Sequence, residues 1–60
     1  LDESVTRLWM SLHERMGDKK GLTMIYTDYV RLLNRELGIR PSDDLVRHYD
    51  SLIGRFANKK

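Results

Sequence analysis

The strongest constraint on the fold is a helix-stop and helix-start signal at residues 37–44, which read LGIRPSDD. Gly38 can adopt the left-handed conformation that closes a helix, and Ile39 can then fold back onto the last turn. Pro41 cannot continue a helix and favours an extended conformation for the residue before it. Ser42 can accept a hydrogen bond from an unpaired amide of a following helix. The sequence therefore predicts two helices joined by one short, well-specified corner.

The length of the chain limits it to one small domain. Sixty residues bury only about 60% of the surface that the unfolded chain exposes. No cysteine is present, so a disulfide or thiolate metal site cannot supplement the core, and helix packing must hold the domain together. Because the sequence starts at Leu1 and not at an initiator Met, we expect residues 1–60 to be a single helical module excised from a larger protein.

The charge and hydropathy of the chain point to no special environment. Eleven Lys and Arg residues against nine Asp and Glu give a net charge of +2, which is too small to indicate nucleic-acid binding. No apolar run approaches the roughly 20 residues that a membrane span needs, and no signal-peptide pattern is visible. The absence of cysteine is compatible with the cytoplasm. We therefore expect a cytoplasmic protein that does not contact the membrane.

Apolar residues at intervals of three and four predict three helices, at about residues 3–16, 20–37 and 43–55. The three apolar stripes consist of Val5, Leu8, Trp9, Leu12 and Met16; of Leu22, Ile25, Tyr26, Tyr29, Leu32, Leu33 and Leu37; and of Leu45, Tyr49, Leu52 and Phe56. Met10 and His13 lie off the first stripe, so we expect the first helix to meet a second surface. The sequence thus predicts an all-α fold.

The second helix has an unusually wide apolar face, because Met24 and Val30 extend it beyond a single stripe. A helix of this kind usually has neighbours on two sides. A strand over residues 22–30 is the alternative, since LTMIYTDYV contains suitable residue types. The helix is preferred because the apolar period is nearer 3.6 than 2 and continues to Leu37.

Catalysis and metal binding have little support in the sequence. His13 and His48 lie on different predicted helices and match no metal-ligand spacing. Ser42 has no His or Lys partner at a recognisable spacing. Asp43 and Asp44 follow this predicted cap, where the helix dipole favours negative charge. We therefore predict that the chain is not an enzyme and has no catalytic residue, cofactor site or metal site.

Three short helices also describe a helix-turn-helix DNA-binding domain, which is the alternative interpretation. The second predicted helix carries Arg31 and Arg35, and Arg40, Arg47 and Arg55 follow along the chain. They are interleaved with Asp28, Glu36, Asp43, Asp44 and Asp50. This mixture is typical of a solvated surface, whereas a DNA-reading helix has a concentrated basic face. The pattern therefore favours a protein partner over DNA.

The chain resembles the C-terminal part of the bacterial transcriptional activator domain from about Glu3 to Leu52. The family pattern has a leucine-rich helix, a Gly-Asp turn, a helix with a central Tyr, a Leu-Gly-Ile/Pro-Ser corner and a last helix with Tyr. The matching residues are Leu8, Leu12, Gly17, Asp18, Tyr26, Leu33, Glu36, Leu37, Gly38, Ile39, Pro41, Ser42, Leu45, Tyr49 and Leu52. Residues 36–42 are the most specific part of this resemblance.

The resemblance implies an array of tetratricopeptide-like helical pairs, in which each helix packs on both neighbours. The first two helices would form one pair, and the third would begin the next repeat or close the array. The family has a small residue, commonly Ala, where this chain has Leu22. We expect Gly21 beside it to allow the close approach of the paired helices.

The resemblance also implies a role in bacterial transcription control. Domains of this family follow a winged-helix DNA-binding domain in SARP-type activators and a receiver domain in some response regulators. They serve interaction and assembly. The expected partners are therefore proteins: neighbouring repeats or domains of the same regulator, another protomer in a homo-oligomer, or the transcription machinery. DNA would be contacted only by a separate domain.

Two groups of residues are expected to carry this role. Those expected to pack, within the module or against a partner, are Trp9, Leu12, Tyr26, Tyr29, Leu33, Leu37 and Tyr49. Those expected to set the geometry of the corner are Gly38, Pro41 and Ser42.

Overall fold

The computed structural model describes residues 3–57, and the side chains up to residue 56. Three helices account for most of this range: α1 (Glu3–Arg15), α2 (Lys19–Leu37) and α3 (Asp43–Ala57). The described residues contain no strand. The predicted all-α, three-helix architecture is therefore confirmed, and the alternative of a strand at residues 22–30 is wrong because these residues lie within α2.

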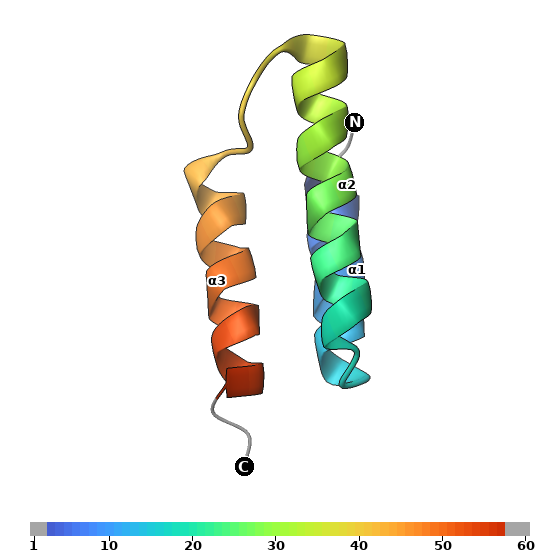
Figure 1. The fold of residues 1–60 in the computed structure, drawn as a ribbon. Helices are drawn as coiled ribbons and strands as arrows, with labels where there is room; N and C mark the ends of the chain where they lie inside the picture. The colour runs from blue at the N-terminus through green and yellow to red at the C-terminus, as the bar shows by residue number, and fades with distance from the viewer. Residues whose placement is uncertain (1–2, 58–60) are drawn as a thin grey trace.

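The helices lie side by side in an elongated body measuring 39 × 17 × 17 Å. Helices α1 and α2 form an antiparallel hairpin, and α3 returns in the direction of α1 (Figure 1). Helix α1 contacts both of the other helices. Helix α1 is therefore the element that the other two share.

The turn between α1 and α2 is closed by backbone hydrogen bonds around Gly17, whose φ of +73° is left-handed. The Gly17 amide donates to the Glu14 carbonyl over 3.0 Å, and the Asp18 amide donates to the His13 carbonyl over 2.8 Å. These two bonds form a Schellman ending. The Asp18 carboxylate then accepts a 2.8 Å hydrogen bond from the Gly21 amide and caps α2. Asp18 therefore ends one helix and starts the next.

The corner between α2 and α3 has the predicted chemistry. Gly38 is left-handed, with a φ of +65°, and its amide donates to the Asn34 carbonyl over 3.0 Å. Ser42 caps α3, because its Oγ accepts a 3.1 Å hydrogen bond from the Leu45 amide. The predicted roles of Gly38 and Ser42 are confirmed. Ile39 remains exposed, so the apolar contact expected of it is limited.

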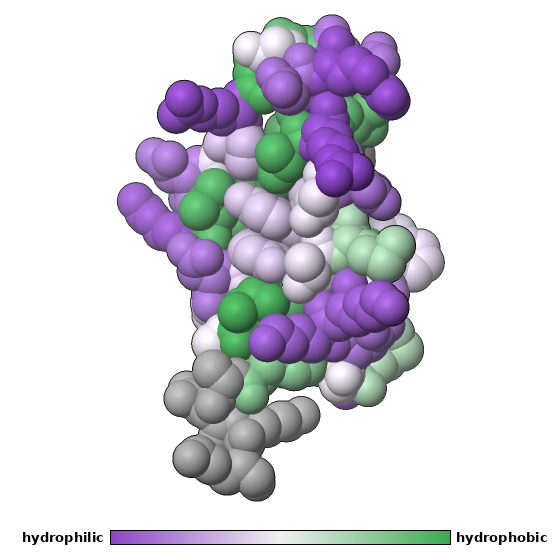
Figure 2. Space-filling model, in the orientation of Figure 1, coloured by the Kyte–Doolittle hydropathy of each residue, from purple (hydrophilic) through white to green (hydrophobic). Residues whose placement is uncertain are grey.

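The core is a single cluster in which all three helices take part. Its buried members are Met10, Leu22, Tyr29, Leu33, Leu45 and Leu52, and Ile25, Tyr26, Tyr49, Ile53 and Phe56 pack against them. The stripes predicted for the second and third helices supply most of this cluster. Figure 2 shows the side formed by α3 and α2, where apolar and pale side chains follow the seam and strongly hydrophilic ones project around it.

The apolar stripe of α1 faces away from the core, whereas its pattern predicts that it faces the core. Every member of that stripe is exposed, by 38–67%, whereas Met10, which lies off the stripe, is 0% exposed. The period of the stripe is helical, as predicted. Trp9 and Leu12, which were expected to pack within the module or against a partner, do not lie in the core. Leu37 is also 57% exposed, because it lies in the last turn of α2.

Candidate interaction surface

One continuous apolar surface runs along the outside of α1. We name it the outer stripe; it consists of Val5, Leu8, Trp9, Leu12 and Met16. With about 100° of rotation per residue, these five positions fall within a sector of about 100° around the helix. Their exposed parts amount to apolar surface on the order of 500 Å², within the range of the largest patch on a typical monomer, which is often functional. The outer stripe is therefore the leading candidate for a binding surface.

The opposite face of α1 is occupied by polar contacts with α3. Near its N-terminus, the Glu3 carboxylate accepts a 2.9 Å hydrogen bond from the Ser42 hydroxyl. That hydroxyl has one proton, so it donates to one Glu3 oxygen while its own oxygen accepts from the Leu45 amide. The Glu3 carboxylate thus lies near the N-termini of two parallel helices, where negative charge is stabilising.

Two further contacts join α1 to α3 along the same face. Ser11 Oγ and His48 Nε2 form a hydrogen bond of 3.2 Å. The Glu14 carboxylate, which is nearly buried, pairs with the Arg55 guanidinium at 3.2 Å. Met10 lies beside them on the inner side of α1 and belongs to the buried core. These contacts determine which face of α1 is internal, and they leave the outer stripe on the surface.

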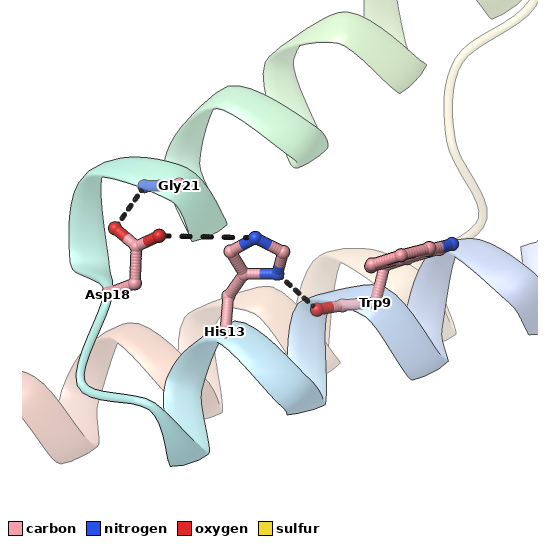
Figure 3. Close-up of polar contacts among 4 residues, drawn as sticks. All are labelled: Trp9, His13, Asp18 and Gly21. Carbon is pink, nitrogen blue, oxygen red and sulfur yellow. Dashed lines mark hydrogen bonds and ion pairs between the residues drawn. The ribbon is translucent and has the colours of Figure 1, made fainter.

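His13 connects α1 to the start of α2 (Figure 3). Its Nδ1–H donates a 2.8 Å hydrogen bond to the Trp9 carbonyl, and its Nε2 lies 3.9 Å from Asp18 Oδ2. A Cβ atom at Gly21 would lie 2.6 Å from His13 Cδ2 and would also overlap Asp18 Oδ2. Gly21 therefore lies directly against the His13 side chain of α1, and Leu22 beside it is fully buried.

An aromatic pair joins α2 to α3. The rings of Tyr26 and Tyr49 are stacked, with centroids 3.9 Å apart and planes inclined by 7°. The Tyr49 hydroxyl donates a 3.3 Å hydrogen bond to Thr23 Oγ1. Burial, and then the nearby Asp50 carboxylate and Tyr49, raise the pKa of the Tyr26 phenol above its ordinary value. This pair serves packing within the module.

The structure divides the residues predicted from the sequence into three groups. Trp9 and Leu12 lie on the outer stripe; Tyr26, Tyr29, Leu33 and Tyr49 lie in or against the core; Leu37, Gly38, Pro41 and Ser42 lie at the corner. Sequence reasoning missed the inward roles of Glu3, Met10 and His48. The available signal was that Met10 and His13 lie off the apolar stripe of α1, which indicated a second contact surface.

The described residues offer little for other kinds of site. They enclose no pocket, and they contain no group of three His, Asp or Glu side chains that could hold a metal ion. Within the same range, no helix is long and apolar enough to cross a membrane. The basic side chains are partly neutralised: Arg35 pairs with Glu36 at 3.6 Å, in addition to the pair between Arg55 and Glu14.

In comparisons with known proteins, the chain matches no family model, no curated protein and no solved structure. The resemblance carried by residues 36–42 therefore stays a prediction.

Proposed function

We propose that the chain is a protein-interaction module of a bacterial transcriptional regulator, built as a tetratricopeptide-like helical pair followed by one further helix. It acts by packing the outer stripe of α1 against another protein. The observation that carries the proposal is the position of this stripe: five apolar side chains lie on the surface, directly opposite the face that holds the module together.

The size of the outer stripe is suited to reversible association. Removing roughly 500 Å² of apolar surface from water favours association by about 12 kcal/mol. The loss of translational and rotational freedom opposes it by an estimated 4–15 kcal/mol. Because the two terms are of similar magnitude, the area does not set the affinity, and a patch of this size belongs to the range of weak, reversible contacts.

The regulatory part of the proposal is supported by the resemblance at residues 36–42 and by the mixed surface charge. In such a regulator, DNA is bound by a separate domain in the cytoplasm. The Arg35 and Arg55 side chains form ion pairs with carboxylates. These pairs weaken the attraction of both side chains for the phosphates of DNA. Packing of helices, and no chemical reaction, is the mechanism.

A tethered reporter tests the proposal. The chain is fused to a sequence-specific DNA-binding domain whose operator lies upstream of a bacterial reporter promoter. We expect the fusion to change reporter output relative to the DNA-binding domain alone, and Leu8→Glu on the outer stripe to abolish that change. Met24→Glu is the matched control, because Met24 on α2 is 56% exposed and Leu8 is 61% exposed. Equal output from the fusion and the DNA-binding domain alone would contradict the proposal.

A salt titration with labelled duplex DNA tests the alternative. We expect the chain alone to show no sequence preference at physiological ionic strength. A DNA-binding domain would bind at micromolar concentrations or below, would weaken steeply with salt, and would lose binding on Arg31→Glu or Arg35→Glu. That result would replace the interaction-module proposal with the DNA-binding one.

A further inference from the structure

We propose that the outer stripe pairs with the outer stripe of a second copy of this chain, antiparallel and related by a two-fold axis. This inference rests on the proposed function, because it names the partner of the same surface. A two-fold interface requires a patch that is complementary to itself. The length, charge and area of the outer stripe each meet this requirement.

The spacing of the five side chains is nearly symmetric along the helix. Val5 and Met16 lie at the ends, and Leu8, Trp9 and Leu12 lie between them. A two-fold axis between residues 10 and 11 places Val5 of one copy against Met16 of the other, over a contact about 16 Å long. The same operation places Trp9 against Leu12, with Leu8 beside that pair and opposite position 13. A smaller side chain thus opposes a larger one in both pairs.

The charges beside the stripe are compatible with the antiparallel arrangement. The flanking positions are Ser4 and Arg15 on one edge and Thr6 and His13 on the other. An antiparallel pair separates the two Arg15 positions by about 13 Å along the helix, which is more than the Debye length of about 8 Å at physiological salt. Antiparallel helix dipoles attract each other, which favours this arrangement over the parallel one.

The area agrees with a weak, specific dimer. Two outer stripes together remove on the order of 1,000 Å² of apolar surface from water, which is about the lower limit for specific protein interfaces. Pairing leaves the inner face of α1 untouched, because Ser11 and Glu14 keep their contacts with α3. The dimer would have the two α1 helices at its centre and α2 and α3 outside.

Sedimentation equilibrium of the whole chain measures the association directly. We expect the average mass to rise with concentration from 7.1 kDa to twice that value, with a midpoint in the micromolar range. Trp9 is the single tryptophan and lies on the stripe, so its emission should shift to shorter wavelength over the same range. Leu8→Glu should keep the chain at 7.1 kDa with unchanged helical circular dichroism, whereas Met24→Glu should dimerise like the parent.

Cysteine cross-linking tests the orientation, because the chain contains no cysteine of its own. We expect a mixture of Val5→Cys and Met16→Cys chains to form an interchain disulfide much faster than Val5→Cys chains alone. Faster bridging between two Val5→Cys chains would overturn the antiparallel arrangement.

The two proposals can fail separately. A chain that stays at 7.1 kDa at every concentration overturns the dimer. If the reporter fusion still responds and the response needs Leu8, the proposed function stands with a different protein as partner. If the reporter does not respond either, both proposals are wrong.

Discussion

Helices α1 and α3 run in the same direction, and each carries apolar residues at intervals of three and four. In α3, Leu45 and Leu52 are buried in the core, as the pattern predicts. In α1, the corresponding stripe lies on the surface, and Met10 enters the core from another face. The period of a stripe therefore reports that a segment is an amphipathic helix. It does not report whether the apolar face meets the rest of the same chain or a different molecule.

The largest expected difference between the two helices is in the cost of truncating a leucine. Leu45→Ala in α3 should destabilise the module by about 2–5 kcal/mol, which is enough to unfold most of so small a domain. Leu8→Ala in α1 should change the free energy of unfolding by about 0.5 kcal/mol or less, because Leu8 is exposed in the monomer. Thermal unfolding at low chain concentration, followed by circular dichroism, checks both. Equal losses would show that the stripe of α1 is internal.

Two glycines provide the next comparison. Gly21→Ala should destabilise the module by about 1–3 kcal/mol, because the added Cβ would overlap Asp18 and crowd His13 at the junction of α1 and α2. Gly54→Ala in α3 should stabilise it by about 1 kcal/mol, because a Cβ there meets nothing within 4 Å and Ala is the better helix former. Urea unfolding measures both. A stabilising Gly21→Ala would contradict the close approach of α1 and α2.

A smaller effect is expected at the cap of α3. Ser42→Ala removes the hydrogen bond to the Leu45 amide and the one to Glu3, and should cost about 1 kcal/mol. Ser51→Ala, at an exposed position within α3, is the control and should change stability by a few tenths of a kcal/mol. If both substitutions had the same effect in urea unfolding, Ser42 would not act as the cap.

The smallest expected effect is on the pH dependence of stability, and it arises where Tyr26 of α2 packs against α3. The pKa of Tyr26 is raised above 10.0, mainly by burial and then by Asp50. The neutral phenol therefore contributes stability that is fully present below pH 10 and is lost as the pH rises through the folded pKa. Tyrosine carbon NMR shifts should show Tyr26 titrating above its ordinary pKa. Asp50→Asn should lower that value only in part, and an unchanged value would exclude a contribution from Asp50.

Features that depend on near neighbours were well predicted from the sequence. Gly38 and Ser42 act on amides and carbonyls within a few residues, so their roles follow from local geometry. Asp18 caps α2 by an equally local contact with Gly21, although the sequence pattern identifies it only as part of a Gly-Asp turn. Asp is a favoured capping residue, and this signal was present in the sequence.

Features that join distant parts of the chain could not be predicted in the same way. Ser11 contacts His48 across 37 positions, and Glu14 contacts Arg55 across 41. Nothing in the spacing of these residues marks them as partners, because each looks like an ordinary surface residue of its own helix. They were missed for that reason, although they define the inner face of α1.

The sequence by itself determined the three helices, the caps and the corner, because these depend on hydrogen bonds and backbone preferences within one or two turns. Only the tertiary structure decided which face of α1 is internal. That choice depends on the joint packing of three helices, in which Met10 fills the core and Ser11 and Glu14 find partners on α3. The apolar outer stripe remains on the surface as a consequence.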